Sequence, residues 1–489
     1  MAHVPVRLLG FPDRRHGDRR LITSSVILNA GLLFAVGFGF LFHLMAARGL
    51  GPAGYGAFTA SLTYVALWAV VMEGGVGVAL TREAAADPRR LAWAPRLALW
   101  RIRLGLVGAA GAVASAWLLH FEPRVLGLIA IMAVGMIGLS AMRLAFAVFR
   151  AVGWFTWEAT FSTLQKLVLL PLTAGALVLG AGAAGVAAAF TLSYAIGAVP
   201  AIGRAWNAVG PALAAPSDPA RPPAGFFLRI CLPLFAIDLL TGLYFRVDQV
   251  LLLRLRGPEE TGLYAAAYRV IEMLLLLVGG TMTVLFPRLA GSARGAPGAF
   301  RADFIRAWRA LWVSSVVFAV NGWLWAVSLL PVIFGSAYGP AQAQLHVLLG
   351  AIPLIYVNYL LTQSLIATGH ERFYAGGTAA CAGVNLGLNL LLIPLWGATG
   401  AAWVTVATEG VLLVICVVGL RALGPIIPLT STLLTGAGAA LAVVIGWWAL
   451  PDQPVERGLL ALAVSVASWE AVAPWPLWKL WARAGPREP

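Results

Sequence analysis

Long apolar runs, separated by short polar or basic segments, occupy most of the chain from Leu21 onward. Each run is long enough to cross a bilayer, because one helical span needs roughly 20 apolar residues. Continuous apolar runs of this length differ from the alternating pattern of a membrane barrel strand. The pattern predicts about 14 transmembrane helices, at 21–46, 55–79, 97–119, 125–148, 157–180, 183–203, 227–253, 262–286, 310–334, 343–367, 373–395, 398–420, 430–450 and 458–478.

A short sequence pattern occurs twice along this series of helices. Residues 50–58 (LGPAGYGAF) are loosely repeated at 256–264 (RGPEETGLY), and each copy lies between two apolar runs. Six predicted helices separate the copies, so both copies enter the membrane in the same direction. The repeat therefore predicts two six-helix lobes in parallel pseudo-repeat, related by an axis along the membrane normal. Two extra helices follow at the C-terminal end.

The predicted organisation is then a series of five regions. A proline-rich segment between the sixth and seventh helices has the composition of a partly extended linker. The run from Leu21 to Ala47 is too long for a cleaved signal peptide, so it is predicted to be the first span. The regions are a basic cytoplasmic tail (1–20), an N-terminal lobe (21–203), a cytoplasmic linker (204–226), a C-terminal lobe (227–420) and two further helices with a cytoplasmic tail (421–489).

Composition supports a membrane protein of the all-α polytopic class. Hydrophobic residues make up 60% of the chain and charged residues 11%, whereas soluble domains carry about 25% charged residues. The net charge of +14 is explained by arginines in predicted cytoplasmic segments, which follow the positive-inside rule and place both termini in the cytoplasm. Nucleic acid is therefore not an expected partner. These arginines are 7, 14, 15, 19 and 20 in the tail, 82, 89, 90 and 96 after the second helix, and 288, 294, 301, 306 and 309 after the eighth.

The cysteines and histidines give no sign of a metal site. Cys231, Cys381 and Cys416 lie in predicted spans far apart in the sequence, and the six histidines are scattered. No pair has the spacing of a disulfide or zinc motif, so we expect neither a metal nor another cofactor. The predicted outside loops at 47–54, 120–124, 180–183 and 395–399 are short. They leave no room for a folded catalytic domain, and we expect the protein not to be an enzyme.

Several motifs, taken in order, resemble a known family. They are ARGLGPxxYGxF at 47–58, Glu73-Gly74, REA at 82–84, Leu232-Pro233, DQVLL at 248–252, GPxxxGxYxAxxR at 257–269 and FPRL at 286–289. In this order they are similar to the bacterial polysaccharide (O-antigen type) flippases of the multidrug/oligosaccharidyl-lipid/polysaccharide flippase superfamily. The resemblance covers roughly residues 21–420.

The resemblance implies both a fold and a function. Such flippases have two helical lobes around a central cavity and work by alternating access. They move a polyprenyl-diphosphate-linked oligosaccharide from the cytoplasmic to the outer leaflet of the bacterial inner membrane, for cell-surface polysaccharide export. The implied partners are this lipid-linked glycan, membrane lipid and polysaccharide polymerases. The driving force stays open among the membrane potential, H⁺ and Na⁺.

A diphosphate can enter the membrane only in a wet, cationic cavity, because its charge must stay compensated. The guanidinium group suits phosphate through its fork of donors. In the second lobe the candidates are Arg246 and Asp248 on the seventh helix, and Arg269 and Glu272 on the eighth. Ionisable residues inside spans indicate function by default. A purely structural ion-pair network is the alternative for Asp248 and Glu272.

In the first lobe the candidates are Glu73, Arg143, Glu158 and Lys166. Lys166 lies deepest, and it either faces the cavity or extends along the helix to the interface. Glu73 either pairs with a cavity arginine or takes up a proton, or else it holds two helices together. Arg101 lies near a cytoplasmic helix end, so we expect its side chain to reach the interface.

Two other functions remain as alternatives. The first is a cation-coupled multidrug antiporter of the same superfamily. Many such antiporters resemble one another in using an acid in the first helix, and residues 21–46 contain no Asp or Glu. The second is a polytopic glycosyltransferase or polymerase, which needs catalytic groups in sizeable outside loops. The segment 47–54 contains no acid, and the parallel repeat favours transport.

Overall fold

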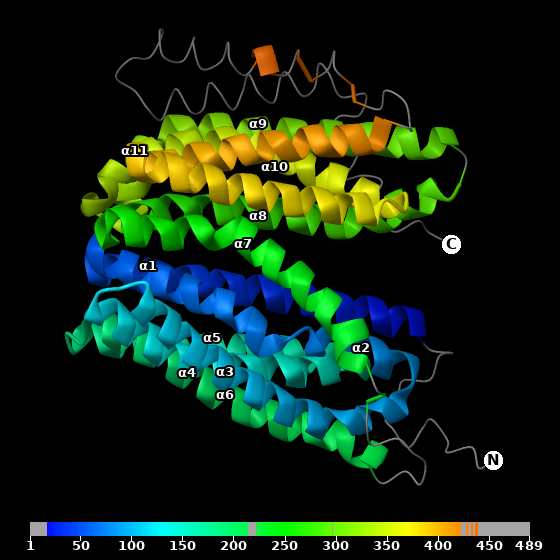
Figure 1. Ribbon diagram of the computed structural model, residues 1–489. Coiled ribbons are helices and arrows are strands. Elements are labelled where there is room, and N and C mark those ends of the chain that lie inside the picture. Colours follow the sequence, from blue (N-terminus) through cyan, green and yellow to red (C-terminus); the bar gives the residue numbers. More distant parts are fainter. Residues whose placement is uncertain are drawn as a thin grey trace. The chain divides into compact units, whose positions relative to one another are not determined.

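The computed structural model describes residues 17–213, 222–223, 225–295, 297–421, 427–428, 432–433 and 436–438. Every regular element within these ranges is a helix (Figure 1). Ten of the helices are long and apolar enough to cross a membrane. The prediction of an all-α polytopic membrane protein is therefore confirmed.

The helices are bounded as follows. The α-helices are α1 (Gly17–Glu73), α2 (Val76–Ala86), α3 (Ala94–Leu118), α4 (Pro123–Ala151), α5 (Phe155–Val178), α6 (Gly182–Leu213), α7 (Leu232–Arg256), α8 (Pro258–Ala293), α9 (Pro297–Phe334), α10 (Gln342–Ala367) and α11 (Glu371–Leu420). Short 3-10 helices occur at Pro88–Trp93 and Ser336–Ala341, and one π turn at Phe227–Cys231 precedes α7. The described chain divides into two compact units, the first ending at Gly262 and the second beginning at Leu263.

Helix α1 is a hairpin of two helical arms. Its backbone departs from helical geometry at Gly51, where φ is 67° and ψ is 176°. The rings of Phe42 and Phe58 lie 5.7 Å apart, whereas a straight helix would separate these positions by about 24 Å. The Tyr55 hydroxyl and His43 Nδ1 also lie within hydrogen-bond distance, at 3.3 Å. Gly51 therefore reverses the chain, and the two arms match the first two predicted helices.

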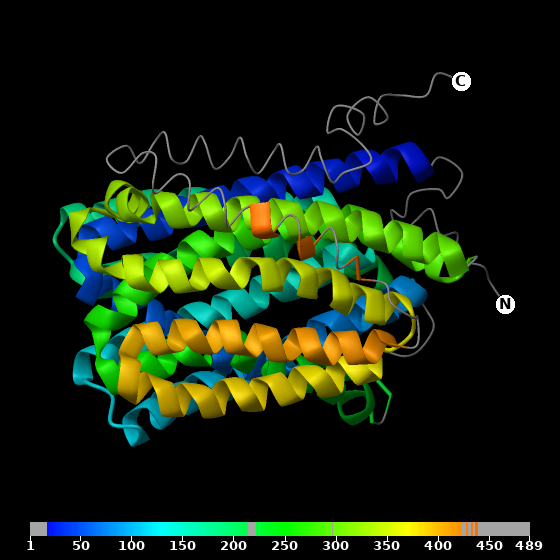
Figure 2. The same cartoon turned by 90° about the horizontal axis from the view of Figure 1, so that it is seen from above.

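Helix α11 in the second unit is a hairpin of the same kind. Gly397 has φ 56° and ψ −138°, and the two arms run side by side, drawn in yellow and orange in Figure 2. Asn385 donates a hydrogen bond to the Thr408 hydroxyl at 3.4 Å, although a straight helix would place them about 35 Å apart. The arms match the eleventh and twelfth predicted helices. Helix α10 packs against both α9 and α11.

The first twelve predicted helices each have a counterpart, but three details were predicted wrongly. The predicted helix 55–79 is broken at Gly74 and Gly75, which both have positive φ, whereas the same dipeptide at Gly279-Gly280 lies inside an unbroken α8, in agreement with the predicted helix 262–286. Helix α6 continues to Leu213, through the first part of the predicted linker. A π turn replaces the first residues of the seventh predicted helix.

Several other predictions lie wholly or largely outside the described residues. These are most of the basic tail (1–20), part of the linker (204–226), and the region 421–489 with its two helices. The division into two six-helix lobes stays a prediction. In the structure α7 is part of the first compact unit and packs against α1. One polar contact between them joins the Thr63 hydroxyl to Gln249 Oε1 at 2.9 Å.

The two copies of the Gly-Pro repeat contact each other directly within the first unit. A Cβ added at Gly56 would lie 1.8 Å from the carbonyl oxygen of Pro258, and one added at Gly262 would lie 1.9 Å from that of Pro52. Each glycine therefore admits the backbone of the other copy, as small residues do where membrane helices cross closely. Gly56 and Gly262, at matching positions of the two copies, are thus packing residues within helices α1 and α8.

Replacing either crossing glycine by alanine should destabilise the protein. The added methyl group meets backbone atoms that cannot rotate away, and overpacking of this kind costs about 1–3 kcal/mol. We expect Gly56→Ala and Gly262→Ala to lower the Tm of the protein purified in detergent. Gly127→Ala in α4, where no atom lies within 4 Å of the added Cβ, is the control. Unchanged Tm values for both crossing variants would contradict the close packing.

Candidate functional site

A polar cavity of about 450 Å³ lies within the first compact unit. Residues from α1, α2, α3, α4, α5, α6 and α7 line it. Its ionisable lining residues are Glu73, Arg101, Arg143, Arg150, Glu158, Lys166 and Asp238. Four of these side chains are cationic and three are carboxylates, so the lining carries more positive than negative charge.

The helix pattern brings these residues to one end of the unit. Because α1 folds back at Gly51, its last residue Glu73 lies at the end from which the chain entered. Arg143 and Arg150 are seven residues apart in the last part of α4, on one helical face. Glu158 and Lys166 share a face in the first half of α5. Asp238, in the second turn of α7, lines the same cavity.

One carboxylate group serves two arginines. Arg143 Nη1 donates a hydrogen bond to Glu73 Oε1, and Arg101 Nη2 lies 3.8 Å from Glu73 Oε2. The side chain of Arg143 is 51% exposed, while that of Arg101 is only 3% exposed. Arg101 also donates through Nε to the Ser140 hydroxyl at 3.1 Å. Among the described residues, its two Nη groups donate no hydrogen bond.

A second ion pair joins α4 and α5. Arg150 donates through Nε to Glu158 Oε2 at 2.8 Å, and through Nη2 to Glu158 Oε1. This two-point geometry is the strong form of an arginine–carboxylate pair. The Glu158 side chain is 6% exposed, but that of Arg150 is 51% exposed. The buried negative charge of Glu158 therefore needs Arg150 as a partner, whereas the positive charge of Arg150 can also be stabilised by water.

The remaining polar lining comes from α5 and α6. Lys166 Nζ lies 5.7 Å from the centre of the Tyr194 ring, an arrangement typical of a cation–π contact. Gln165 donates to the Ser193 hydroxyl at 2.8 Å. Lys166 lines this cavity, and its role there stays a prediction. Amide, hydroxyl and ammonium groups together provide donors suited to an oxygen-rich ligand.

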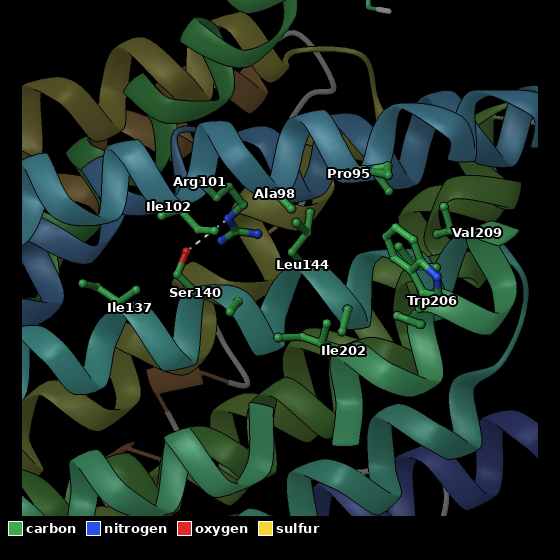
Figure 3. Close-up of a pocket in the computed structure, with 15 residues that line it drawn as sticks. Pro95, Ala98, Arg101, Ile102, Ile137, Ser140, Leu144, Ile202, Trp206 and Val209 are labelled. Carbon is green, nitrogen blue, oxygen red and sulfur yellow. Dashed lines mark hydrogen bonds between the residues drawn. The ribbon is translucent and has the colours of Figure 1, made fainter. Parts of the chain in front are cut away.

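Helix α4 separates this cavity from an apolar pocket of about 210 Å³ (Figure 3). Ser140, Leu144 and Val148 line the pocket, while Arg143 and Arg150 lie on the cavity side. Figure 3 shows Arg101 reaching from α3 to Ser140 at the edge of α4. Arg101 lines both spaces. The expectation that it extends to the interface was wrong, because its bond to Ser140 and the nearby Glu73 hold it inside the helix bundle.

The eight sequence candidates fall into two groups. Glu73, Arg143, Glu158 and Lys166 meet in the cavity, whereas the second-lobe candidates do not line it. On α7, Asp248 is 6% exposed and accepts the backbone N–H of Gln249 at 2.7 Å, while Arg246 is exposed. On α8, Arg269 donates to Glu272 one turn away. A cavity role for these four stays a prediction.

Arg150 and Asp238 are cavity residues that the sequence argument did not single out. Arg150 could have been found from its spacing of seven residues from Arg143, which places both on one face of a helix. Asp238 is an acid inside the predicted span 227–253, but its place in the cavity depends on how α7 packs. Within the described residues, no group of three or more His, Cys, Asp or Glu side chains could hold a metal ion.

The unequal burial of Arg150 and Glu158 predicts unequal effects of removing each charge. Arg150→Gln leaves a buried carboxylate short of partners, at a cost of about 1–3 kcal/mol. Glu158→Gln leaves Arg150 half-exposed, so that water can form hydrogen bonds with its guanidinium group. We expect Arg150→Gln to lower the Tm of the purified protein more than Glu158→Gln does, and the double variant to recover part of the loss. Equal losses in the two single variants would contradict this reading of the pair.

Comparison with known proteins is informative at the levels of family and fold. The family model described as polysaccharide biosynthesis protein matches residues 22–292, which is more than half of the chain. No curated protein sequence matches the chain. A solved structure of the lipid II flippase MurJ, in an inward closed conformation, is similar with a TM-score of 0.75 and 11% identity, over 94% of this chain and 99% of that one.

Two other transporters have related structures. An inward-facing multidrug resistance MATE family transporter of the MOP superfamily has a TM-score of 0.62 at 14% identity, over 82% of this chain and 98% of its own. A MOP superfamily transporter from Pyrococcus furiosus has a TM-score of 0.59 at 16% identity, over 82% and 94%. At these identities the likeness is one of fold. The chain belongs to the polysaccharide biosynthesis protein family and has the helical fold of these flippases and transporters.

Proposed function

We propose that the protein is a flippase for a polyprenyl-diphosphate-linked oligosaccharide. It moves this lipid from the cytoplasmic to the outer leaflet of the bacterial inner membrane by alternating access, for export of a cell-surface polysaccharide. Family membership and the fold shared with the lipid II flippase support a lipid-linked substrate.

The excess of cationic groups in the cavity is the observation that carries the proposal. Four cations and three carboxylates line a space inside a unit made of apolar helices. Unpaired charge within a membrane is costly and indicates a bound partner of opposite sign. A diphosphate supplies negative charge and several acceptor oxygens, and arginine recognises such groups well.

The remaining lining fits the other parts of the same substrate. Gln165, Ser162 and Tyr194 offer hydrogen bonds, which a sugar requires when it leaves bulk water. The polyprenyl chain needs no protein cavity, because it can stay in the lipid. One polar cavity bounded by apolar helices therefore suits a substrate with a charged, hydroxyl-rich head and a hydrocarbon tail.

The position of the cavity fits loading from the cytoplasm. Its residues gather at the end of the first unit where α1 starts and where the arginine-rich turn after α2 lies. The positive-inside rule assigns this end to the cytoplasm. Synthesis from nucleotide-activated sugars would deliver the lipid-linked glycan on that side. Either the membrane potential or exchange for H⁺ or Na⁺ would then drive release outside.

A cation-coupled multidrug antiporter is the second candidate, since MATE family transporters have a similar fold. An acidic cavity would suit an antiporter that exports cationic drugs. The cationic balance of this cavity favours an anionic substrate instead. A polytopic glycosyltransferase or polymerase is a weaker candidate, because the neighbours in fold are flippases and transporters.

The decisive test is deletion of the gene, followed by extraction of the lipid-linked intermediates. We expect surface glycan to be lost and a polyprenyl-diphosphate-linked oligosaccharide to accumulate in the inner leaflet. The wild-type gene should reverse both effects. If no such lipid accumulates and sensitivity to cationic drugs rises instead, the antiporter hypothesis is the better one.

Single cavity variants then test the site. Arg143→Ala and Lys166→Ala should lower surface glycan about tenfold or more, because a hydrogen bond to a charged group contributes roughly 1.5–3 kcal/mol. Protein levels in the membrane should not change. Arg246→Ala and Arg269→Ala test the second-lobe candidates in the same assay, and we expect loss there too. Normal glycan from all four variants would overturn the site assignment.

A further inference from the structure

Glu73 is placed where a bound anion would be expected. Its two carboxylate oxygens face two guanidinium groups, with Arg143 donating to Oε1 and Arg101 Nη2 at 3.8 Å from Oε2. No other carboxylate among the described residues forms an ion pair with either arginine. A single negative charge is thus shared between two positive ones.

The buried guanidinium group of Arg101 has fewer polar partners than it could bind. Its side chain is 3% exposed, so water contributes little, and both Nη groups lack a hydrogen bond among the described residues. Buried polar groups are normally satisfied, because an unmet donor costs free energy. The Arg101–Arg143 pair therefore retains capacity for a larger anion with more acceptor oxygens. A diphosphate offers both properties, and a carboxylate offers neither.

The backbone next to Glu73 is a two-glycine break between helices, called the glycine joint below. Glu73 ends α1, Gly74 and Gly75 follow with φ values of 53° and 68°, and α2 begins at Val76. Two successive residues in the left-handed region are readily tolerated only as glycine. A carboxylate at the end of a helix, directly before such a joint, can leave its partners without unwinding the helix that carries it.

The same joint contacts the start of α7. A Cβ added at Gly75 would lie 2.4 Å from the carbonyl oxygen of Cys231, in the π turn that precedes α7. Asp238, two turns further along α7, lines the cavity together with Glu73. A displacement of Glu73 and the adjoining glycines would therefore change the contact with α7, which lines the same cavity.

We infer that Glu73 is a tethered competitor for the anionic group of the substrate. In the state described here, its carboxylate holds the Arg101–Arg143 site. The diphosphate of the lipid displaces it, takes both guanidinium groups, and releases Glu73 with the adjoining glycine joint. Glu73 thereby weakens diphosphate binding, which assists release of the substrate after transport. This inference rests on the proposed function, since it assumes a diphosphate in this cavity.

The test measures the affinity of the purified, detergent-solubilised protein for farnesyl diphosphate, with farnesol as the uncharged probe. Removing the competing charge with Glu73→Gln should tighten farnesyl diphosphate binding about tenfold, which equals about 1.4 kcal/mol. Farnesol binding should not change. Arg101→Gln and Arg143→Gln should each weaken farnesyl diphosphate binding. The Tm of every variant is measured, so that loss of folding is recognised.

Glu158→Gln is the matched control, because it removes the same charge from the same cavity at a carboxylate paired with Arg150. It should change affinity much less than Glu73→Gln. Equal tightening in the two variants would mean that net charge alone matters, and would overturn the inference. Unchanged or weaker binding by Glu73→Gln would overturn it too, and would make Glu73 a clamp that positions the arginines. Absence of farnesyl diphosphate binding by the wild-type protein would instead count against the proposed substrate itself.

Discussion

Compensation of charge inside a membrane is the constraint on which this structure depends. An ion removed from water must find an opposite charge or hydrogen-bonding partners close by. In the first unit, Glu73 faces Arg101 and Arg143, and Glu158 is held at two points by Arg150. In the second unit, the buried Glu409 carboxylate accepts a hydrogen bond from Asn358 at 2.7 Å. These groups add ion pairs and hydrogen bonds to the apolar contacts between the helices that carry them.

Helix α4 shows how one element can serve two environments. Its cavity face carries Arg143 and Arg150, and its other face carries Ser140 and Leu144 beside the apolar pocket. Other residues of α4 pack against α1, α3 and α6. Arg101 on the neighbouring α3 lies at the border between the two spaces. Its guanidinium is therefore sensitive to what occupies either one.

The sequence allowed most of the fold to be predicted, because an apolar run long enough to span a membrane can scarcely form anything but a helix. It also allowed Glu73, Arg143, Glu158 and Lys166 to be chosen, since charge within a span is rare. The direction of a long side chain is a different matter. Arg101 could point to water or inward, and only the packing of α3 against α4 decides between them. The placement of Asp238 likewise depends on contacts between helices far apart in sequence.

The break at Gly74-Gly75 illustrates another limit. The same dipeptide at Gly279-Gly280 continues a helix, so the residue types do not determine the conformation. At Gly75 the approach of the Cys231 carbonyl excludes any side chain, which is a tertiary reason that no local pattern contains. The same dipeptide can therefore occur twice in one chain and differ in its geometry.

The contact between Gly56 and Pro258, and between Gly262 and Pro52, has a consequence for biosynthesis. The turn of the first helical hairpin is synthesised early, but the backbone that packs against it belongs to residues synthesised some two hundred positions later. The backbone contact at Gly56 can therefore form only after the first residues of α8 have been synthesised. Until then, the hairpin lacks one of its closest backbone contacts. Completion of the first unit is thus tied to the arrival of the second copy of the repeat.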